Sequence, residues 1–305
     1  LAISIRDVEG DPRQAFNLFA ESRKLARAIG NQGAEAHNLG HIAILRAEWG
    51  EYTAAVENYR ECLALFRAAG LRQDVAGYLN PLASLYRALG QYELAAAALD
   101  EALRISVEVE HAQIQGWTHL NLGRLALELG QPDQARESYA SAFSLATEHH
   151  IPLIEAHALL GLGQVHLANS DFNAASQQLS RALGLFAELD TGAAVLTRAY
   201  MGLAHLGLGE LDTALTHSRA ALESVESGVG TFLEVQQVYL YHFRVLRAMG
   251  ASADAQRWLD KGRAITLAQA DRLNEDWRAT FLGVVPVNRE IMATWEVEGQ
   301  QKIMW

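Results

Sequence analysis

The chain has 305 residues, half of them apolar, and a formal net charge of −11 at pH 7. This charge argues against a general nucleic-acid binder, which needs a basic face to displace counterions from phosphates. No apolar run is long enough to span a bilayer, so we expect no contact with a membrane. Cys62 is the only cysteine, which excludes a disulfide framework and suits a reducing cytoplasm.

One pattern returns with a period of about 40 residues along most of the chain. It is anchored on a glycine, replaced once by serine, at seven positions: Gly10, Gly50, Gly90, Gly130, Ser170, Gly209 and Gly250. Five residues after every anchor stands an alanine, and twelve residues after it stands a small residue. Apolar residues recur at three- and four-residue spacing on both sides of each anchor, which predicts two amphipathic helices per period. A fixed period of this length is typical of a helical solenoid.

The repeated residues have physical reasons. The anchor glycine follows the last apolar residue of the first helix, where a left-handed conformation ends a helix well. The small positions are those at which two helix backbones approach closely. Neither helix can bury its apolar stripe alone, so neighbouring repeats must stack on one another.

These residues resemble the tetratricopeptide repeat family. The family's pattern has a leucine and a small residue in the first helix, a glycine at the turn and two alanines in the second helix. In the fourth complete repeat these are Leu162, Gly163, Ser170, Ala175 and Ala182, with serine in place of the turn glycine. The family's bulky residue in the second helix is also present as Tyr59, Leu99, Tyr139 and Leu179, whereas Ser218 departs from it. The resemblance covers roughly residues 9 to 265 and implies an all-α, right-handed α-α superhelix.

The repeat length narrows the resemblance. Family repeats are usually shorter, and this 40-residue form is similar to the C-terminal sensor arms of bacterial STAND-type signal-transduction NTPases, such as the maltose regulator. That resemblance implies a cytoplasmic regulatory arm whose partners include other domains of the same longer chain. The lack of an initial Met and a first repeat cut short before Gly10 also lead us to expect a piece of a longer chain.

Three segments are expected in chain order. Residues 1–30 hold the second helix of a truncated repeat, and residues 31–265 hold six helix-turn-helix repeats. Residues 266–305 form a capping helix pair and a tail, with a break at Pro286 and a second helix to about Trp295, because a solenoid must cover its last apolar face. The spacing stumbles at Ser227–Thr231, a plausible hinge or a tolerated change of loop length.

The sequence offers little for catalysis. It contains no Gly-Lys dipeptide, so this segment has no P-loop, and no nucleophile motif occurs. His37 and His41 lie four residues apart on one predicted helix, but a zinc site needs at least three protein ligands. We therefore expect no metal, no cofactor and no enzyme activity.

In the resembled family the first helix of each repeat lines a concave groove. Carried onto this chain, the groove positions with polar or aromatic side chains are His37, His41, Asn80, Ser84, Arg87, Trp117, Asn121, Arg124, His157, Gln164, Tyr200, Gln237, Tyr241, Arg244 and Arg247. Their mixture is typical of a binding surface. The four arginines could grip a carboxylate or phosphate of a protein, peptide or small effector. Alternatively, they pair with neighbours such as Glu48 and Glu128 and only solvate the groove.

These observations predict a non-catalytic interaction and sensing arm. A stand-alone peptide receptor of the quorum-sensing kind and a self-associating scaffold remain open as rivals.

Overall fold

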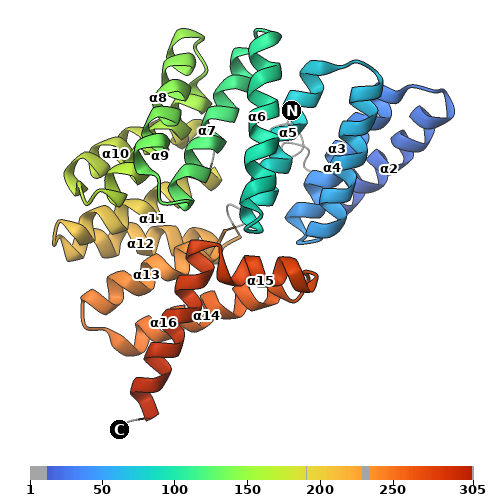
Figure 1. The fold of residues 1–305 in the computed structure, drawn as a ribbon. Helices are drawn as coiled ribbons and strands as arrows, with labels where there is room; N and C mark the ends of the chain where they lie inside the picture. The colour runs from blue at the N-terminus through green and yellow to red at the C-terminus, as the bar shows by residue number, and fades with distance from the viewer. Residues whose placement is uncertain (1–11, 190, 229–233, 304–305) are drawn as a thin grey trace.

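The computed structural model describes residues 12–189, 191–228 and 234–303, and over these residues it contains helices and no strands. The helices are α2 (Pro12–Ala28), α3 (Gln32–Glu48), α4 (Tyr52–Ala68), α5 (Arg72–Ala88), α6 (Tyr92–Glu108), α7 (Ala112–Glu128), α8 (Pro132–Glu148), α9 (Pro152–Ala168), α10 (Phe172–Leu189), α11 (Thr191–Gly207), α12 (Leu211–Glu226), α13 (Gln236–Ala248), α14 (Ser252–Ala270), α15 (Glu275–Gly283) and α16 (Pro286–Ile303). They follow one another along an arc (Figure 1), which confirms the expected all-α solenoid.

A left-handed residue ends most of the helices. Gly50 has φ +76° at an anchor, and the serine that replaces glycine, Ser170, has φ +58°. Between repeats, Gly70 and Glu110 adopt the same conformation, with φ +71° and +51°. The predicted anchor turn is therefore confirmed, and the same turn recurs between repeats, where the sequence had not indicated it. The helices from α2 to α9 consequently all have the same length, 17 residues.

The small positions are buried where helices touch. Ala55, Ala95 and Ala135 are fully buried, as are the small residues seven positions later, Cys62, Ala102 and Ala142. In α2, which has no preceding repeat among the described residues, the corresponding Ser22 is exposed. Gly163 shows the reason, since a Cβ atom built there would lie 2.7 Å from the Leu179 side chain. The small residues thus recur at a fixed period because the helices come into close contact at the same position of each repeat.

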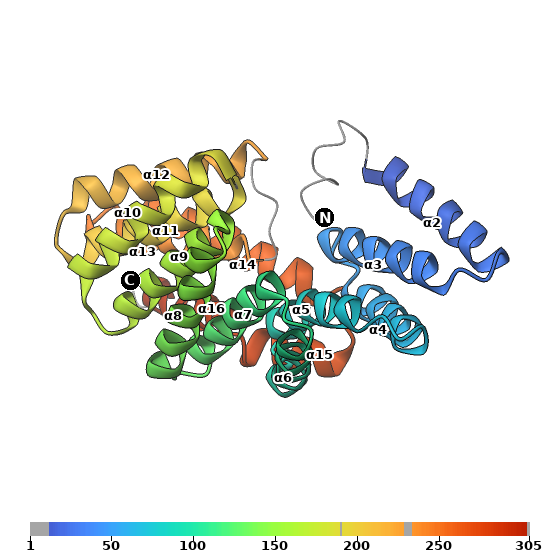
Figure 2. The ribbon, with the colours of Figure 1, turned by 90° about the horizontal axis from the view of Figure 1, so that it is seen from above.

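The C-terminal helix pair does more than cover the last repeat. Thr280 of α15 donates a hydrogen bond to the Leu89 carbonyl (2.9 Å) and accepts one from Gln91 (2.7 Å), at the turn between α5 and α6. Arg272 donates to the Trp49 carbonyl at the turn between α3 and α4 (2.6 Å). The end of the solenoid therefore folds back beneath its first two complete repeats (Figures 1 and 2).

A shared apolar core accompanies this closure. Phe281, Val285 and Ile291 belong to the same buried cluster as Leu85 and Leu89 of the second complete repeat. Burial of side chains of this size typically contributes about 1.5–3 kcal/mol each. The contact is therefore a part of the core.

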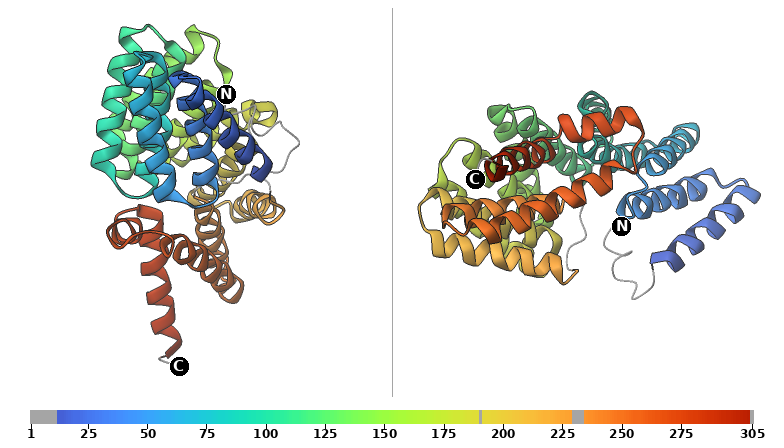
Figure 3. Two further views of the ribbon diagram at one scale, coloured as in Figure 1. Left: turned by 90° about the vertical axis from the view of Figure 1, so that its right-hand side faces the viewer. Right: turned by 90° about the horizontal axis from the view of Figure 1, so that it is seen from below.

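The C-terminal helices α14 and α16 are longer than the sequence predicts. The last helix does not end near Trp295 but runs to Ile303, because the stretch after Trp295 is rich in Glu and Gln and lacks proline. This helix projects from the body (Figure 3). Helix α14 continues through residue 265 to Ala270. Anchor Gly10 and residues 229–231 of the suspected hinge lie outside the described residues.

Within the described part of the chain, none of the helices combines the length and the apolar character needed to cross a bilayer.

Candidate binding site on the inner face

A cavity of about 170 Å³ lies where four repeats meet the C-terminal pair. Its walls come from the first helices of their repeats, α7, α9, α11 and α13, and from the junction between α15 and α16. The polar side chains that line it are those of Arg124, Glu128, Gln164, Tyr200, Glu234, Gln237, Tyr241 and Glu290. Five of these eight positions had been predicted as groove residues.

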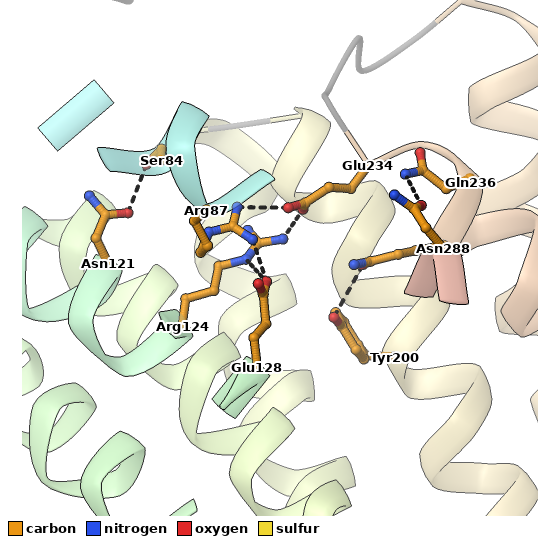
Figure 4. A network of polar contacts seen from close by, with 10 residues as sticks. Ser84, Arg87, Asn121, Arg124, Glu128, Tyr200, Glu234, Gln236 and Asn288 are labelled. Atoms are coloured by element: carbon orange, nitrogen blue, oxygen red, sulfur yellow. Dashed lines mark hydrogen bonds and ion pairs between the residues drawn. The ribbon is translucent and has the colours of Figure 1, made fainter. Parts of the chain in front are cut away.

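Two arginines and two glutamates form an ion cluster at one end of the cavity (Figure 4). Nη2 of Arg87 donates to Glu234 (2.7 Å), while Arg87 Nη1 contacts Glu128. Arg124 Nη2 binds the second carboxylate oxygen of Glu234, so one carboxylate bridges α5 and α7. The side chains of Arg87, Glu128 and Glu234 are 6%, 15% and 10% exposed, and that of Arg124 is 28% exposed.

The charges of this cluster balance, which its burial requires. Burial and the neighbouring Arg87 lower the pKa of Arg124. An unpaired charge in such a place costs several kcal/mol, and charge-assisted hydrogen bonds offset much of that cost. Arg87 Nε and Glu128 Oε2 are buried without a hydrogen-bond partner among the described residues, so the set of bonds is not complete. Arg87 and Arg124 therefore need carboxylates as partners, and in this structure Glu128 and Glu234 supply them.

An amide ladder joins α5 to α7 beside the cluster. Asn80 donates to Thr118 Oγ1 and Asn121 donates to Asn80 Oδ1, both at 3.0 Å. Ser84 in turn donates to Asn121 Oδ1 at 3.0 Å. These predicted groove residues thus bind one another and fix the relation of the two helices that carry the arginines.

The opposite wall of the cavity is aromatic and neutral. The Tyr200 hydroxyl donates to Gln237 Oε1 (3.2 Å), and the rings of Tyr200 and Tyr241 lie 5.2 Å apart. Burial, and next the neighbouring Tyr200, raise the pKa of Tyr241, so this wall stays uncharged near neutral pH. The site therefore combines a charge-balanced ion cluster at one end with an amphipathic wall.

Arg244 and Arg247 occupy a different place. Arg244 Nε donates to Glu290 (3.0 Å), and Arg247 contacts Glu298 (2.9 Å), so both connect α13 to α16. Neither belongs to the Arg87–Arg124 cluster.

The cavity is also not lined by four other predicted residues, His37, His41, Trp117 and His157. His41 is buried against Phe19 of α2, with ring centroids 4.7 Å apart, and burial followed by His37 lowers its pKa. Trp117 and His157 pack on each other at 5.2 Å. In the ranges that the structure describes, no three His, Cys, Asp or Glu side chains gather as a metal site would require.

Sequence reasoning missed Glu234. Its contacts to Arg124 and Arg87 span 110 and 147 residues, and it lies outside the regular helices next to the irregular spacing. The 40-residue period cannot indicate such a residue, because Glu234 does not occupy a repeated position. The acidic partner Glu128, by contrast, had been named as an alternative for the arginines.

Comparison with known proteins shows which repeat family and which solved structures the chain is similar to. A model of the tetratricopeptide repeat matches residues 74–148, about a quarter of the chain. No curated protein matches the sequence.

Solved structures resemble the chain over most of its length. A Rap protein in complex with the competence and sporulation factor has a TM-score of 0.64 at 12% identity, covering 97% of this chain and 91% of that one. The Rap conjugation gene regulator of plasmid pLS20, in complex with the Phr* peptide, has a TM-score of 0.63 at 12% identity, with coverages of 90% and 77%. BtubC from P. vanneervenii has a TM-score of 0.57 at 23% identity, with coverages of 72% and 92%.

At these identities the likeness concerns the fold. Residues 74–148 match the tetratricopeptide repeat, and the shared architecture leads to one conclusion: the chain folds as a helical solenoid of the kind that such repeats form.

Proposed function

We propose that this solenoid is a non-catalytic binding arm whose inner cavity receives an acidic residue of a protein or peptide partner. The observation that carries the proposal is the buried Arg87–Arg124 pair, of which Arg124 lines a cavity with a Tyr- and Gln-lined wall. Two guanidinium groups that share one carboxylate favour a planar anion with several acceptor oxygens. A cavity of about 170 Å³ has room for a side chain or a chain end, and it is too small for a drug-sized molecule.

The 40-residue repeats support a setting within a larger cytoplasmic regulator, as the C-terminal arm of a bacterial signalling NTPase. Partner binding would then act on the other domains only through a difference in affinity between two states. A stand-alone peptide receptor is the second candidate. It is favoured by the similarity to two Rap structures, one in complex with the competence and sporulation factor and one in complex with the Phr* peptide. The negative charge of the chain speaks against nucleic acid in both settings.

A selection from a library of displayed random heptapeptides tests the proposal. We expect the purified chain to enrich peptides with Asp or Glu at one fixed position. The double variant Arg124→Ala/Arg244→Ala should lose this preference, because it removes a cavity cation and a cation of the neighbouring α13. The melting temperature should fall as well, because Arg124→Ala leaves the buried carboxylate of Glu234 with one cation fewer. Binding is therefore compared at a temperature at which circular dichroism shows each variant to be folded.

The control variant is Arg104→Ala/Arg136→Ala, which removes the same charge from exposed second helices. It should keep the acidic preference. Enrichment of the same peptides by all three proteins would refute the proposal.

A further inference from the structure

Glu234 already occupies the place that an acidic partner would take. Its two carboxylate oxygens are divided between Arg87 and Arg124, and its side chain lines the cavity. We infer that Glu234 is an internal competitor, which a carboxylate of the partner must displace from the Arg87–Arg124 pair. This inference rests on the proposed function, and it adds the mechanism by which the site is kept filled.

The two glutamates of the cluster are not equivalent. Glu128 is in α7, one helical turn from Arg124, with 4.0 Å between their nearest charged atoms. It is a fixed part of the rigid wall. Glu234 precedes α13 and comes from a repeat that is far away in sequence. It can therefore leave the arginines without unfolding the helix that carries them.

The local charges make exchange feasible. With both glutamates in place the cluster is neutral, and a partner carboxylate that replaces that of Glu234 keeps it neutral. Arg124 retains 28% exposure of its side chain, which gives an incoming group access to it from the cavity. Simple addition of a third carboxylate would instead leave the buried cluster with a net negative charge, which is costly. Exchange is thus the route that the geometry favours.

Exchange also links binding to the shape of the arm. Glu234 connects the α13 side of the solenoid to α5 and α7. When a partner displaces it, this connection is lost, while the partner gains contacts on the same helices. The partner can bind only molecules in which Glu234 has left the arginines. The apparent affinity is therefore the intrinsic affinity multiplied by the fraction of molecules in this open state.

The test compares Glu234→Gln with Glu128→Gln, which removes the same charge from the same cluster. The probe is a fluorescein-labelled tetraglutamate peptide, with tetraglutamine as the neutral control, and the readout is fluorescence anisotropy. If Glu234 fills the site in nine of ten molecules, Glu234→Gln should bind tetraglutamate about tenfold more tightly than the unmodified chain. Glu128→Gln should gain clearly less, and Arg124→Ala added to Glu234→Gln should abolish the gain.

A second variant guards against misfolding. Glu234→Asp keeps the charge but shortens the side chain, so its affinity should lie between those of the unmodified chain and Glu234→Gln. Circular dichroism checks that each variant is folded.

The remaining outcomes separate this inference from the proposed function. If the unmodified chain and Glu234→Gln bind tetraglutamate equally, and Arg124→Ala weakens binding in both, Glu234 is not a competitor. The proposal of an acidic partner then still stands. An equal gain in Glu234→Gln and Glu128→Gln reveals a general effect of charge and also overturns the competitor. If no variant binds tetraglutamate, the competitor is overturned, and the peptide selection alone decides the proposed function.

Discussion

His242 illustrates how one residue departs from the repeat for a local reason. Its Nδ1 lies 3.0 Å from the Ser218 hydroxyl, and its ring packs edge-on against Trp258 at 5.9 Å. Ser218 stands where other repeats carry a bulky residue, and it meets the His242 ring instead. Burial, with a smaller contribution from Arg219, lowers the pKa of His242 to about 4.

This pKa predicts a dependence of stability on pH. Between pH 4 and 6.5 the unfolded chain binds a proton at position 242 that the folded chain does not, so stability falls as the pH falls through this window. Between pH 7.5 and 5 the unmodified chain should lose about 2 kcal/mol more unfolding free energy than His242→Gln. Urea denaturation of both proteins at the two pH values measures the difference. Parallel losses in both would contradict a buried, neutral His242.

At the scale of the element, the turns carry two kinds of glycine. Gly90 and Gly130 both end the first helix of a repeat with φ +74°. A Cβ atom on Gly130 would meet nothing within 4 Å, whereas one on Gly90 would lie 2.8 Å from the Thr280 carbonyl oxygen of α15. The first glycine serves its own turn only, and the second also leaves room for the returning C-terminal helix.

The pair Gly90→Ala and Gly130→Ala therefore measures the closure contact. Each substitution should cost about 1–2 kcal/mol for the left-handed backbone conformation. Gly90→Ala should cost roughly 1–3 kcal/mol more, because its methyl group crowds α15. Chemical denaturation gives both values, and the prediction fails if the two variants are equally stable.

At the scale of the whole molecule, the solenoid is closed by contacts between its ends. The hydrogen bonds of Thr280 to Leu89 and of Arg272 to Trp49 span 191 and 223 residues. On the side of the C-terminal helix pair, the inner cavity is lined by Val285, Pro286, Val287 and Glu290. The partner that we propose would therefore meet a small site with a wall formed by the C-terminal helix pair.

Thr280→Val should loosen this closure, because it removes the hydroxyl that binds Leu89 and Gln91 but keeps the shape of the side chain. Amide hydrogen exchange should rise in α15 and at the turn between α5 and α6. The loss of unfolding free energy should be about 1–2 kcal/mol. Thr147→Val is the control, since its hydroxyl binds only a carbonyl within its own exposed helix. Similar exchange at these two segments in both variants would show that the hydroxyl plays no part in closure.

The sequence by itself determined the repeat and its helices. Glycine or serine at each anchor and alanine at each contact report on neighbours within one or two helices, and such short-range demands leave a period in the chain. The predicted positions Asn80, Ser84 and Asn121 meet across adjacent repeats for the same reason.

Only the tertiary structure decided which groups form the site. Whether α15 reaches the turn at Gly90, and whether Glu234 reaches Arg87, depends on rotations between repeats that add up over the whole arc. Each rotation follows from the packing of many side chains and leaves no mark at any single position. The arginines could thus be placed on the inner face from sequence, but their partner Glu234 and the cavity beside them could not.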